Sequence, residues 1–374
     1  MRCRQIELQD FRNIETATVS FSPGVNLLYG DNAQGKTNLL EGLYYTALGK
    51  TFRAGHDGEL IRFGREAASV RNVFCEEGRA DRTLTFRMMQ GRGGRIVERN
   101  GVRARSMSEV VGDFRVVLFC PSHLSVVQGA PEDRREFLNV AISQLRPVYV
   151  TALKKFNRAL KERNALLRRA QETGSRPDDT VDLWSEQLAA ACADIAARRA
   201  DYLLRLDERM KKCFSDMTDG RELPGVGYQN SLGLPAAEML SAEEICPLYY
   251  KKLTENLARE VGAGSTLYGV HRDDISLLLN DRPARLYASQ GQQRSLALAM
   301  KLAEGSISGE DMGGELPVFL FDDVLSELDS RRRGYLLKEL TGRQVIMTSC
   351  EDISRDVAGE EVKAIRVENG RYFE

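Results

Sequence analysis

The sequence lacks the cysteine patterns that form the disulfide framework of small secreted proteins or bind structural zinc. Its 374 residues include seven cysteines, and no two of them form a Cys-x-x-Cys pair. They are scattered over the chain, at positions 3, 75, 120, 192, 213, 246 and 350. An odd and scattered set argues against a disulfide framework or a zinc knuckle, and it fits a reducing compartment.

Long hydrophobic runs and a strong net charge are also missing. No stretch approaches the roughly 18–20 apolar residues that cross a bilayer. Residues 1–11 alternate like a strand and lack the apolar core of a signal peptide. We therefore expect a soluble, cytoplasmic protein with no membrane partner. Because the net charge is only −1, contact with nucleic acid would have to come from local basic patches or from an assembly.

The most informative pattern lies in residues 25–48. Apolar residues from Val25 to Tyr29 predict a short buried strand, and helical spacing begins at Leu39. The segment between them matches the phosphate loop G-x-x-x-x-G-K-[ST], with Gly30, Asp31, Asn32, Ala33, Gln34, Gly35, Lys36 and Thr37. The alternative is a Gly-rich turn that ends in Lys-Thr by chance. The strand before it and the helix after it favour a nucleotide site.

The residue types in this loop suit a bound triphosphate. Glycines let backbone N–H groups curl around a phosphate without a Cβ in the way. The helix start adds unpaired N–H donors and a partial positive charge. We expect Lys36 to reach the β- and γ-phosphates and the Thr37 hydroxyl to be a ligand for Mg²⁺. The predicted cofactors are ATP and Mg²⁺.

A second candidate element is the apolar run Val318–Phe321, which ends in Asp322 and Asp323. Ligands gather at the carboxyl ends of strands in a parallel α/β sheet. Asp322 is therefore placed to hold Mg²⁺ opposite Thr37, and Asp323 to position or deprotonate the attacking water. An acidic turn after a core strand is the alternative, but the phosphate loop in the same chain favours the metal.

The segment Ser289–Arg294 precedes an amphipathic helical pattern and offers a serine cap, a glycine and free helix-start amides. This is a second potential anion site, built like the first. Taken alone it would be weak, because Ser-x-Gly before a helix is often only a cap. The residues expected to touch nucleotide here are Ser289, Gly291 and Gln292.

The rest of the chain reads as an α/β protein with a helical middle. Strands are expected at residues 4–8, 15–21, 67–75, 82–90, 94–105, 116–119, 267–270, 275–279 and 344–347, with a hairpin turn at Asn100-Gly101. A helical region starts at Pro131 and forms an antiparallel hairpin broken near Gly174. Residues 219–240 look like a loop. Ser241 with Glu244 resembles the start of a helix to about Val261, but Pro247 conflicts with it, which leaves that start open.

Two stretches are rich in positive charge. Arginines at 79, 82, 87, 92, 95, 99, 103 and 105 lie on the predicted strands, where they are solvated or face DNA. The first helix of the hairpin carries Lys154, Lys155, Arg158, Lys161, Arg163, Arg168 and Arg169, opposed within that span only by Glu162. A solvated face and a contact with phosphates are both open for this helix.

Together, the phosphate loop, the Ser289 segment and the acidic pair resemble ABC-type ATPases. The distance from Thr37 to Ser289 is too long for a compact transporter cassette and too short for a very long coiled coil. The chain resembles the RecF family of bacterial recombination and gap-repair proteins from end to end. The supporting segments are Asp10–Asn13, the phosphate loop, Cys120–Leu124, Pro131–Leu138, His271–Asp274, Ser289–Arg294 and Asp322–Asp329.

The resemblance implies an ATPase head built from residues 1–118 together with 266–374, and a helical insertion from 119–265. It also implies ATP-dependent DNA binding, slow ATP hydrolysis, and a head-to-head homodimer in which the Ser289 segment of one copy closes over the nucleotide of the other. Implied partners are double-stranded DNA and gap junctions, RecO and RecR, with RecA loaded at single-strand gaps and stalled forks.

Some positions depart from the pattern or stay open. Asp323 stands where most cassette ATPases have glutamate, and Asn139 stands where the family usually has aspartate. Gln128 is a loose candidate for the glutamine that couples Mg²⁺ to the second lobe. Arg12 approaches the phosphates or is solvated, and His271 is functional or structural.

Two other classes of function compete. A transporter-driving cassette ATPase would need a coupling surface for membrane partners and a short helical insert, which the basic helical arm does not suit. A kinase using only the phosphate loop would leave the Ser289 segment unexplained.

Overall fold

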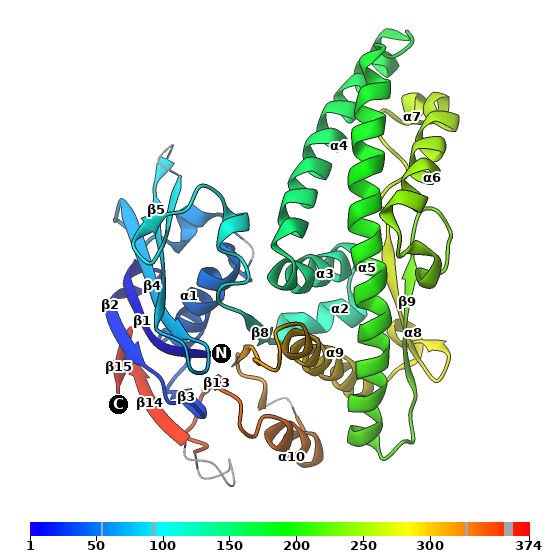
Figure 1. Cartoon of the computed structure of the whole chain (residues 1–374). Coiled ribbons are helices and arrows are strands. Elements are labelled where there is room, and N and C mark those ends of the chain that lie inside the picture. Colours follow the sequence, from blue (N-terminus) through cyan, green and yellow to red (C-terminus); the bar gives the residue numbers. More distant parts are fainter. Residues whose placement is uncertain (54, 92–93, 326–327, 355–361) are drawn as a thin grey trace. The chain divides into compact units, whose positions relative to one another are not determined.

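The computed structural model of the chain describes residues 1–53, 55–91, 94–325, 328–354 and 362–374 (Figure 1). Its strands are β1 (Arg2–Phe11), β2 (Ile14–Ser20), β3 (Val25–Tyr29), β4 (Ala67–Cys75), β5 (Arg82–Met89), β6 (Arg95–Arg99), β7 (Val102–Arg103), β8 (Val116–Phe119), β9 (Pro224–Gln229), β10 (Asp274–Leu279), β11 (Arg282–Pro283), β12 (Val318–Phe321), β13 (Val345–Ser349), β14 (Val362–Glu368) and β15 (Arg371–Phe373). Its α-helices are α1 (Lys36–Leu48), α2 (Ser125–Gln128), α3 (Pro131–Leu145), α4 (Pro147–Thr173), α5 (Thr180–Thr218), α6 (Ala242–Glu255), α7 (Leu257–Ala263), α8 (Ala284–Tyr287), α9 (Gln290–Asp311) and α10 (Ser330–Glu339).

The chain forms two compact units. The first, here the head unit, combines Met1–His123 with Leu298–Glu374, and the second, the helical unit, is Leu124–Ala297. Residues 266–297 fall in the helical unit because β10 pairs with β9 along its length. The domain division expected from the sequence, with its boundary at 265/266, stays a prediction.

An antiparallel sheet of the head unit follows the alternating sequence pattern. Its strand order is β2-β1-β4-β5-β6-β7. Ile6 and Leu8 point into the core while their neighbours face outward, as a half-buried strand requires. Asn100 and Gly101 both have positive φ, which is the backbone of the predicted two-residue hairpin turn. The predicted strands of this region are confirmed.

The other sheet of the head unit carries the phosphate loop. Its order is β15-β14-β3-β13-β12-β8, and all pairs except β14–β15 are parallel. Every residue of β8 and β12 is buried, which explains their continuous apolar sequence. The loop after β3 and the acids after β12 both leave the sheet at its carboxyl edge. Sequence reasoning missed β14 and β15.

The helical unit contains the predicted hairpin. Helices α4 and α5 run side by side, and α4 ends at Gly174, whose left-handed backbone (φ 64°) stops the helix. Arg163 lies on the inner side of α4 and is fully buried. It therefore does not belong to the basic outer face to which the sequence pattern assigned it.

Three expectations for this unit were wrong. Residues 219–240 are not only loop, because β9 lies within them and pairs with β10. Residues 267–270 form no strand, since Gly269 has φ of 134° and its amide bonds the Ser231 hydroxyl. The helix expected from 241 to 261 is two helices that meet at Asn256. Ser241 does cap α6, and Pro247 lies within that helix.

Along the described residues, none of the helices combines the length and the apolar run that crossing a bilayer requires.

Candidate nucleotide site

The phosphate loop lies between the end of β3 and the start of α1, and its glycines are required by close packing. Gly30 has φ of 144°, and a Cβ there would come within 2.3 Å of the Val367 carbonyl oxygen of β14. That separation is impossible for a real side chain, so position 30 has to be glycine while β14 stays in place. Gly35 has φ of 115° and precedes the first residue of α1.

The loop is braced by residues that are distant in sequence. The Gly370 amide donates to the Gln34 carbonyl oxygen at 2.8 Å, and the Tyr372 hydroxyl donates to the Gly35 carbonyl at 3.0 Å. Asn13 Nδ2 donates to the Ala33 carbonyl at 3.3 Å. These bonds give three carbonyl oxygens of the loop partners outside it, and they fix the loop backbone. Nothing local in the sequence marks Gly370 or Tyr372, because their role depends on the pairing of β14 with β3.

Lys36 and the start of α1 supply positive charge. Lys36 is buried, and its Nζ donates to the carbonyls of Gly30 at 2.5 Å and Asp31 at 2.7 Å. The N-cap residue Gly35 has no side chain to cap the helix, so the first amides of α1 keep their donor capacity. A cation and a set of helix-start amides therefore converge at one place.

Thr37 and Asp322 are in contact at the carboxyl edge of the sheet. The Thr37 hydroxyl donates to Asp322 Oδ1 at 2.7 Å, and the Thr348 hydroxyl donates to the same oxygen at 3.0 Å. Burial raises the pKa of Asp322, and the two hydroxyl bonds offset part of that rise. Asp323 follows with φ of 54°, and its amide bonds the Thr348 hydroxyl at 2.9 Å. A hydroxyl and a carboxylate in contact are the donor set expected of a Mg²⁺ site.

Arg12 contacts a carboxylate of α1. Its guanidinium makes two bonds to Glu41, of 2.9 and 2.8 Å, and Glu41 is fully buried. Arg53 lies 3.8 Å from the same carboxylate. The paired fork geometry fixes the loop between β1 and β2 against the helix that follows the phosphate loop.

The Ser289 segment forms a reciprocal cap on α9. Ser289 Oγ accepts from the Gln292 amide at 3.3 Å, and Gln292 Oε1 accepts from the Ser289 amide at 2.7 Å. This is a capping box with glutamine at its third helical position. The Ser289 oxygen acts as an acceptor in this bond, so its proton is available to a ligand. Ser289, Gly291 and Gln292 belong to the helical unit, and Lys36, Thr37, Asp322 and Asp323 belong to the head unit.

Two motifs that carry the family resemblance form one cluster in the helical unit. Arg134 of α3 makes two bonds to Asp274 of β10, at 2.6 and 2.9 Å, and Arg135 donates to the Asp273 carbonyl at 2.8 Å. Asn139, where the family usually has aspartate, accepts from Tyr149 and Arg199. These contacts join α3, α4, α5 and β10, which gives the residues a packing role.

His271 is held in the same unit by its Nε2, which lies 3.2 Å from the Thr266 carbonyl oxygen. Its ring packs 5.8 Å from that of Phe156. Burial lowers the pKa of His271 to about 4, so the side chain is neutral near pH 7. Ser326 and Glu327, which belong to the last family segment, lie outside the described residues.

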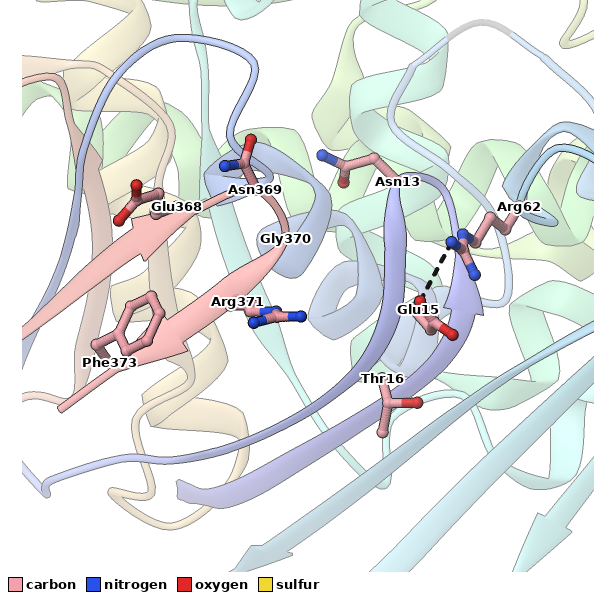
Figure 2. Close-up of a pocket in the computed structure, with 9 residues that line it drawn as sticks. All are labelled: Asn13, Glu15, Thr16, Arg62, Glu368, Asn369, Gly370, Arg371 and Phe373. Carbon is pink, nitrogen blue, oxygen red and sulfur yellow. Dashed lines mark hydrogen bonds and ion pairs between the residues drawn. The ribbon is translucent and has the colours of Figure 1, made fainter.

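A pocket of about 720 Å³ opens beside the phosphate loop, between the β1–β2 turn and the β14–β15 hairpin (Figure 2). Its lining includes Asn13, Asn369 and Gly370, which border the loop, together with Arg371 and Phe373. The volume lies in the range of small-molecule sites. The remaining lining residues are Glu15, Thr16, Arg62 and Glu368. Amides, hydroxyls, charged side chains and an aromatic ring are groups that can hold a planar heterocycle or a sugar.

The two basic stretches differ in how their charge is compensated. On the antiparallel sheet, several arginines pair with carboxylates: Arg79 with Glu76, Arg82 and Arg99 with Asp113, and Arg87 with Glu98. On α4, within the described part of the chain, we find no ion pair for six exposed side chains, here called the arm cations: Lys154, Lys155, Arg158, Lys161, Arg168 and Arg169. Arg158 lies 5.8 Å from the Trp184 ring. Positive charge without an ion-pair partner in the described part of the chain is therefore concentrated on α4, although Arg169 acts electrostatically on the Asp178 carboxylate.

Comparison with known proteins identifies the family. The family model described as RecF/RecN/SMC N terminal domain matches residues 2–372. A protein of Staphylococcus carnosus named DNA replication and repair protein RecF is 35% identical over the whole length of both chains. The chain belongs to the RecF family. A member of the same name from an Exiguobacterium species is 37% identical, with 99% of this chain and 98% of that protein covered.

Solved structures agree with this assignment. Two structures of the recombination mediator protein RecF in the RecFOR pathway, described as RecF-ATPrS and RecF-ATP, match with TM-scores of 0.91 and 0.90 at 33% identity. They cover 100% and 99% of this chain, and 97% and 96% of those chains. The Smc head domain of Pyrococcus furiosus matches at 16% identity with a TM-score of 0.56, which shows a shared fold. The α/β ATPase-head fold expected from the sequence is confirmed.

Proposed function

We propose that the protein is an ATP-dependent DNA-binding switch of recombinational repair. The observation that carries the proposal is the 2.7 Å contact between Thr37 Oγ1 and Asp322 Oδ1, at the mouth of the phosphate loop. The RecF relatives named for DNA replication and repair, and the RecF structure described with ATP, support it.

In this proposal the loop from Gly30 to Thr37 holds the triphosphate of ATP. Lys36 exchanges its two carbonyl partners for phosphate oxygens, and Thr37 with Asp322 holds Mg²⁺. Within the described ranges no group of three His, Cys, Asp or Glu side chains could bind a metal alone. Such a site suits Mg²⁺ shared with phosphates, because this ion keeps waters and takes few protein ligands. Asp323 positions the attacking water in a slow hydrolysis.

We place the nucleoside end of ATP in the pocket of Figure 2. The pocket shares Asn13, Asn369 and Gly370 with the bracing of the loop, so a nucleotide whose phosphates fill the loop can extend into it. Phe373 offers an apolar ring for the base. This placement accounts for the amides and the aromatic ring at a position next to the loop.

ATP then joins two copies of the protein. Ser289, Gly291 and Gln292 of one copy complete the γ-phosphate site of the other, since the Ser289 proton and the start of α9 are suited to an anion. Hydrogen bonds to a charged group contribute about 1.5–3 kcal/mol each. Loss of the γ-phosphate removes these bonds and opens the dimer.

We assign duplex DNA contact to the arm cations of α4. None of them forms an ion pair among the described residues, and only Arg169 is near enough to act electrostatically on a carboxylate for which a pKa shift is resolved, that of Asp178. Several of the sheet arginines, in contrast, are paired. Cations that replace counterions on phosphates supply sequence-independent affinity. In this proposal the protein acts at gap junctions and stalled forks, works with RecO and RecR, and helps to load RecA.

The test measures the association state and duplex binding with and without ATP. We expect both to increase with ATP in the wild-type protein and to lose that response in Lys36→Ala. An association state and a DNA affinity that ignore ATP would contradict the proposal. The transporter and kinase alternatives gain no support, because the relatives carry repair names.

A further inference from the structure

We propose that Gln128 is a positioning residue for the Ser289 segment, rather than a ligand of the metal. Gln128 Nε2 donates to Gln293 Oε1 at 2.6 Å. Both residues belong to the helical unit, so this contact lies within one compact body. Only the predicted effect of Gln128 on dimerisation depends on the proposed function.

Gln293 is the buried end of this contact. It is 6% exposed, and its Nε2 donates to the Ala284 carbonyl of α8 at 3.2 Å. Its side-chain amide is therefore shared between α2 and α8 in a mostly buried position, next to the exposed Gln128. A buried amide needs its hydrogen-bond partners, since an unmet group costs about 1–3 kcal/mol in general. The bond from Gln128 satisfies the Gln293 oxygen.

Gln292, the residue before Gln293, is held by a different part of the helical unit. Gln292 Nε2 donates to Glu222 Oε1 at 2.5 Å, while Gln292 Oε1 holds the Ser289 amide at 2.7 Å. The first turn of α9 is thus tied to α2 through Gln293 and to the segment before β9 through Gln292. Side chains at consecutive positions of a helix point about 100° apart, so the two ties act on different sides of the same turn.

This arrangement has a consequence for the anion site. The Ser289 hydroxyl and the first amides of α9 bind a phosphate well only if they are fixed before it arrives. With Gln128 removed, the Gln293 amide has to find another partner, and the turn that carries Ser289 loosens. The bond uses the amide nitrogen of Gln128 and leaves its oxygen out, and in our proposal the residue acts through Gln293 and not through Mg²⁺. The two roles therefore predict different behaviour of a Gln128 variant.

The first experiment is amide hydrogen exchange of nucleotide-free protein, read over residues 289–297. We expect faster exchange there in Gln128→Ala than in wild type, and no change in Gln187→Ala, which removes an exposed glutamine of α5. Gln128→Glu keeps an oxygen that can accept from Gln293 after its amide turns, so it should be intermediate. Unchanged exchange in Gln128→Ala would overturn the proposal.

The second experiment measures the dimer dissociation constant with ATP, the ATP affinity of dilute protein, and the Mg²⁺ concentration for half-maximal turnover. Gln128→Ala should weaken dimerisation roughly tenfold, the equivalent of one lost hydrogen bond, and leave the other two values within twofold of wild type. A raised Mg²⁺ requirement with wild-type dimerisation would overturn the proposal in favour of a metal role. If wild type stays monomeric with ATP, the proposed function fails, and the exchange result still decides whether Gln128 holds the segment.

Discussion

The fully buried ion pair of the helical unit gives a quantitative test of the structure. Arg163 Nη2 of α4 lies 2.7 Å from Glu260 Oε2 of α7, and neither side chain is exposed. Arg163 also donates to Ser185 and Thr266, and Glu260 accepts from the Leu267 amide. The pair joins three helices and the segment after α7, where no solvent can replace a lost partner.

The perturbation is Glu260→Gln, which keeps the size of the side chain and an acceptor for the Leu267 amide. It leaves the Arg163 charge buried with only neutral partners. Removing one member of a buried pair destabilises proteins by about 3–5 kcal/mol. Because the hydroxyls of Ser185 and Thr266 and the Leu253 carbonyl remain as neutral acceptors for Arg163, we expect the low end, about 3 kcal/mol. For a unit of this size that corresponds to a fall in Tm of roughly 6–12 °C.

The assay is thermal and urea unfolding followed by circular dichroism at 222 nm, in the absence of nucleotide. Arg163→Met/Glu260→Leu is the matched control, because replacing both charges by apolar groups of similar length removes the buried charge altogether. We expect the double variant to be more stable than Glu260→Gln. A loss below about 1 kcal/mol in Glu260→Gln, or a double variant that is worse than the single one, would refute the reasoning.

Three further predictions concern DNA, nucleotide and pH. Replacing Lys155, Lys161 and Arg168 by glutamine should reduce the slope of log K for duplex binding against log salt concentration by about one unit per lost phosphate contact. Glutamine at sheet arginines that already have acidic partners should leave this slope unchanged. Equal effects of the two sets would contradict the assignment of DNA contact to α4. Phe373→Ala should weaken ATP binding and leave the binding of inorganic tripolyphosphate unchanged. Weaker binding of both ligands would contradict the placement of the nucleoside in the pocket. The pKa of His271 is 6.5 in the unfolded chain and about 4 in the folded protein, so the unfolded state takes up a proton first as the pH falls. The stability that this histidine contributes above pH 6.5 is therefore lost progressively towards pH 4. The loss is at most about 3 kcal/mol. His271→Gln should flatten that part of the stability curve measured by urea unfolding, and an unchanged curve would show that the ring is not buried neutral.

Sequence reasoning succeeded where the local pattern and the fold agree. Alternation found β1, β2, β4 and β5, and the apolar runs found β3, β8 and β12, because burial of one or both faces fixes the residue types. The loop between β3 and α1 could be placed for the same reason, since an apolar strand precedes it and helical spacing follows it; the roles of its residues toward a phosphate stay a prediction. Its juxtaposition with Asp322 follows from the parallel sheet rule.

The missed features depend on long-range pairing or on burial of polar groups. β9 contains two glycines and a proline, which suggest a loop, and only its pairing with β10 makes it a strand. Arg163 has the same sequence character as its exposed neighbours, and only the position of Glu260 shows that it points inward. The contact between Gln128 and Gln293 spans 165 residues, so no local signal could reveal it.

The place of β3 within its sheet has a consequence for synthesis of the chain. Its two neighbours, β13 and β14, are translated more than 300 residues after it. A nascent chain therefore contains Lys36 and Thr37 early, but β3 lacks both of its neighbouring strands until the last part of the chain leaves the ribosome. Messages cut short before the codons of residues 362–373 would produce fragments in which the loop after β3 lacks β14 beside it and the two bonds from Gly370 and Tyr372.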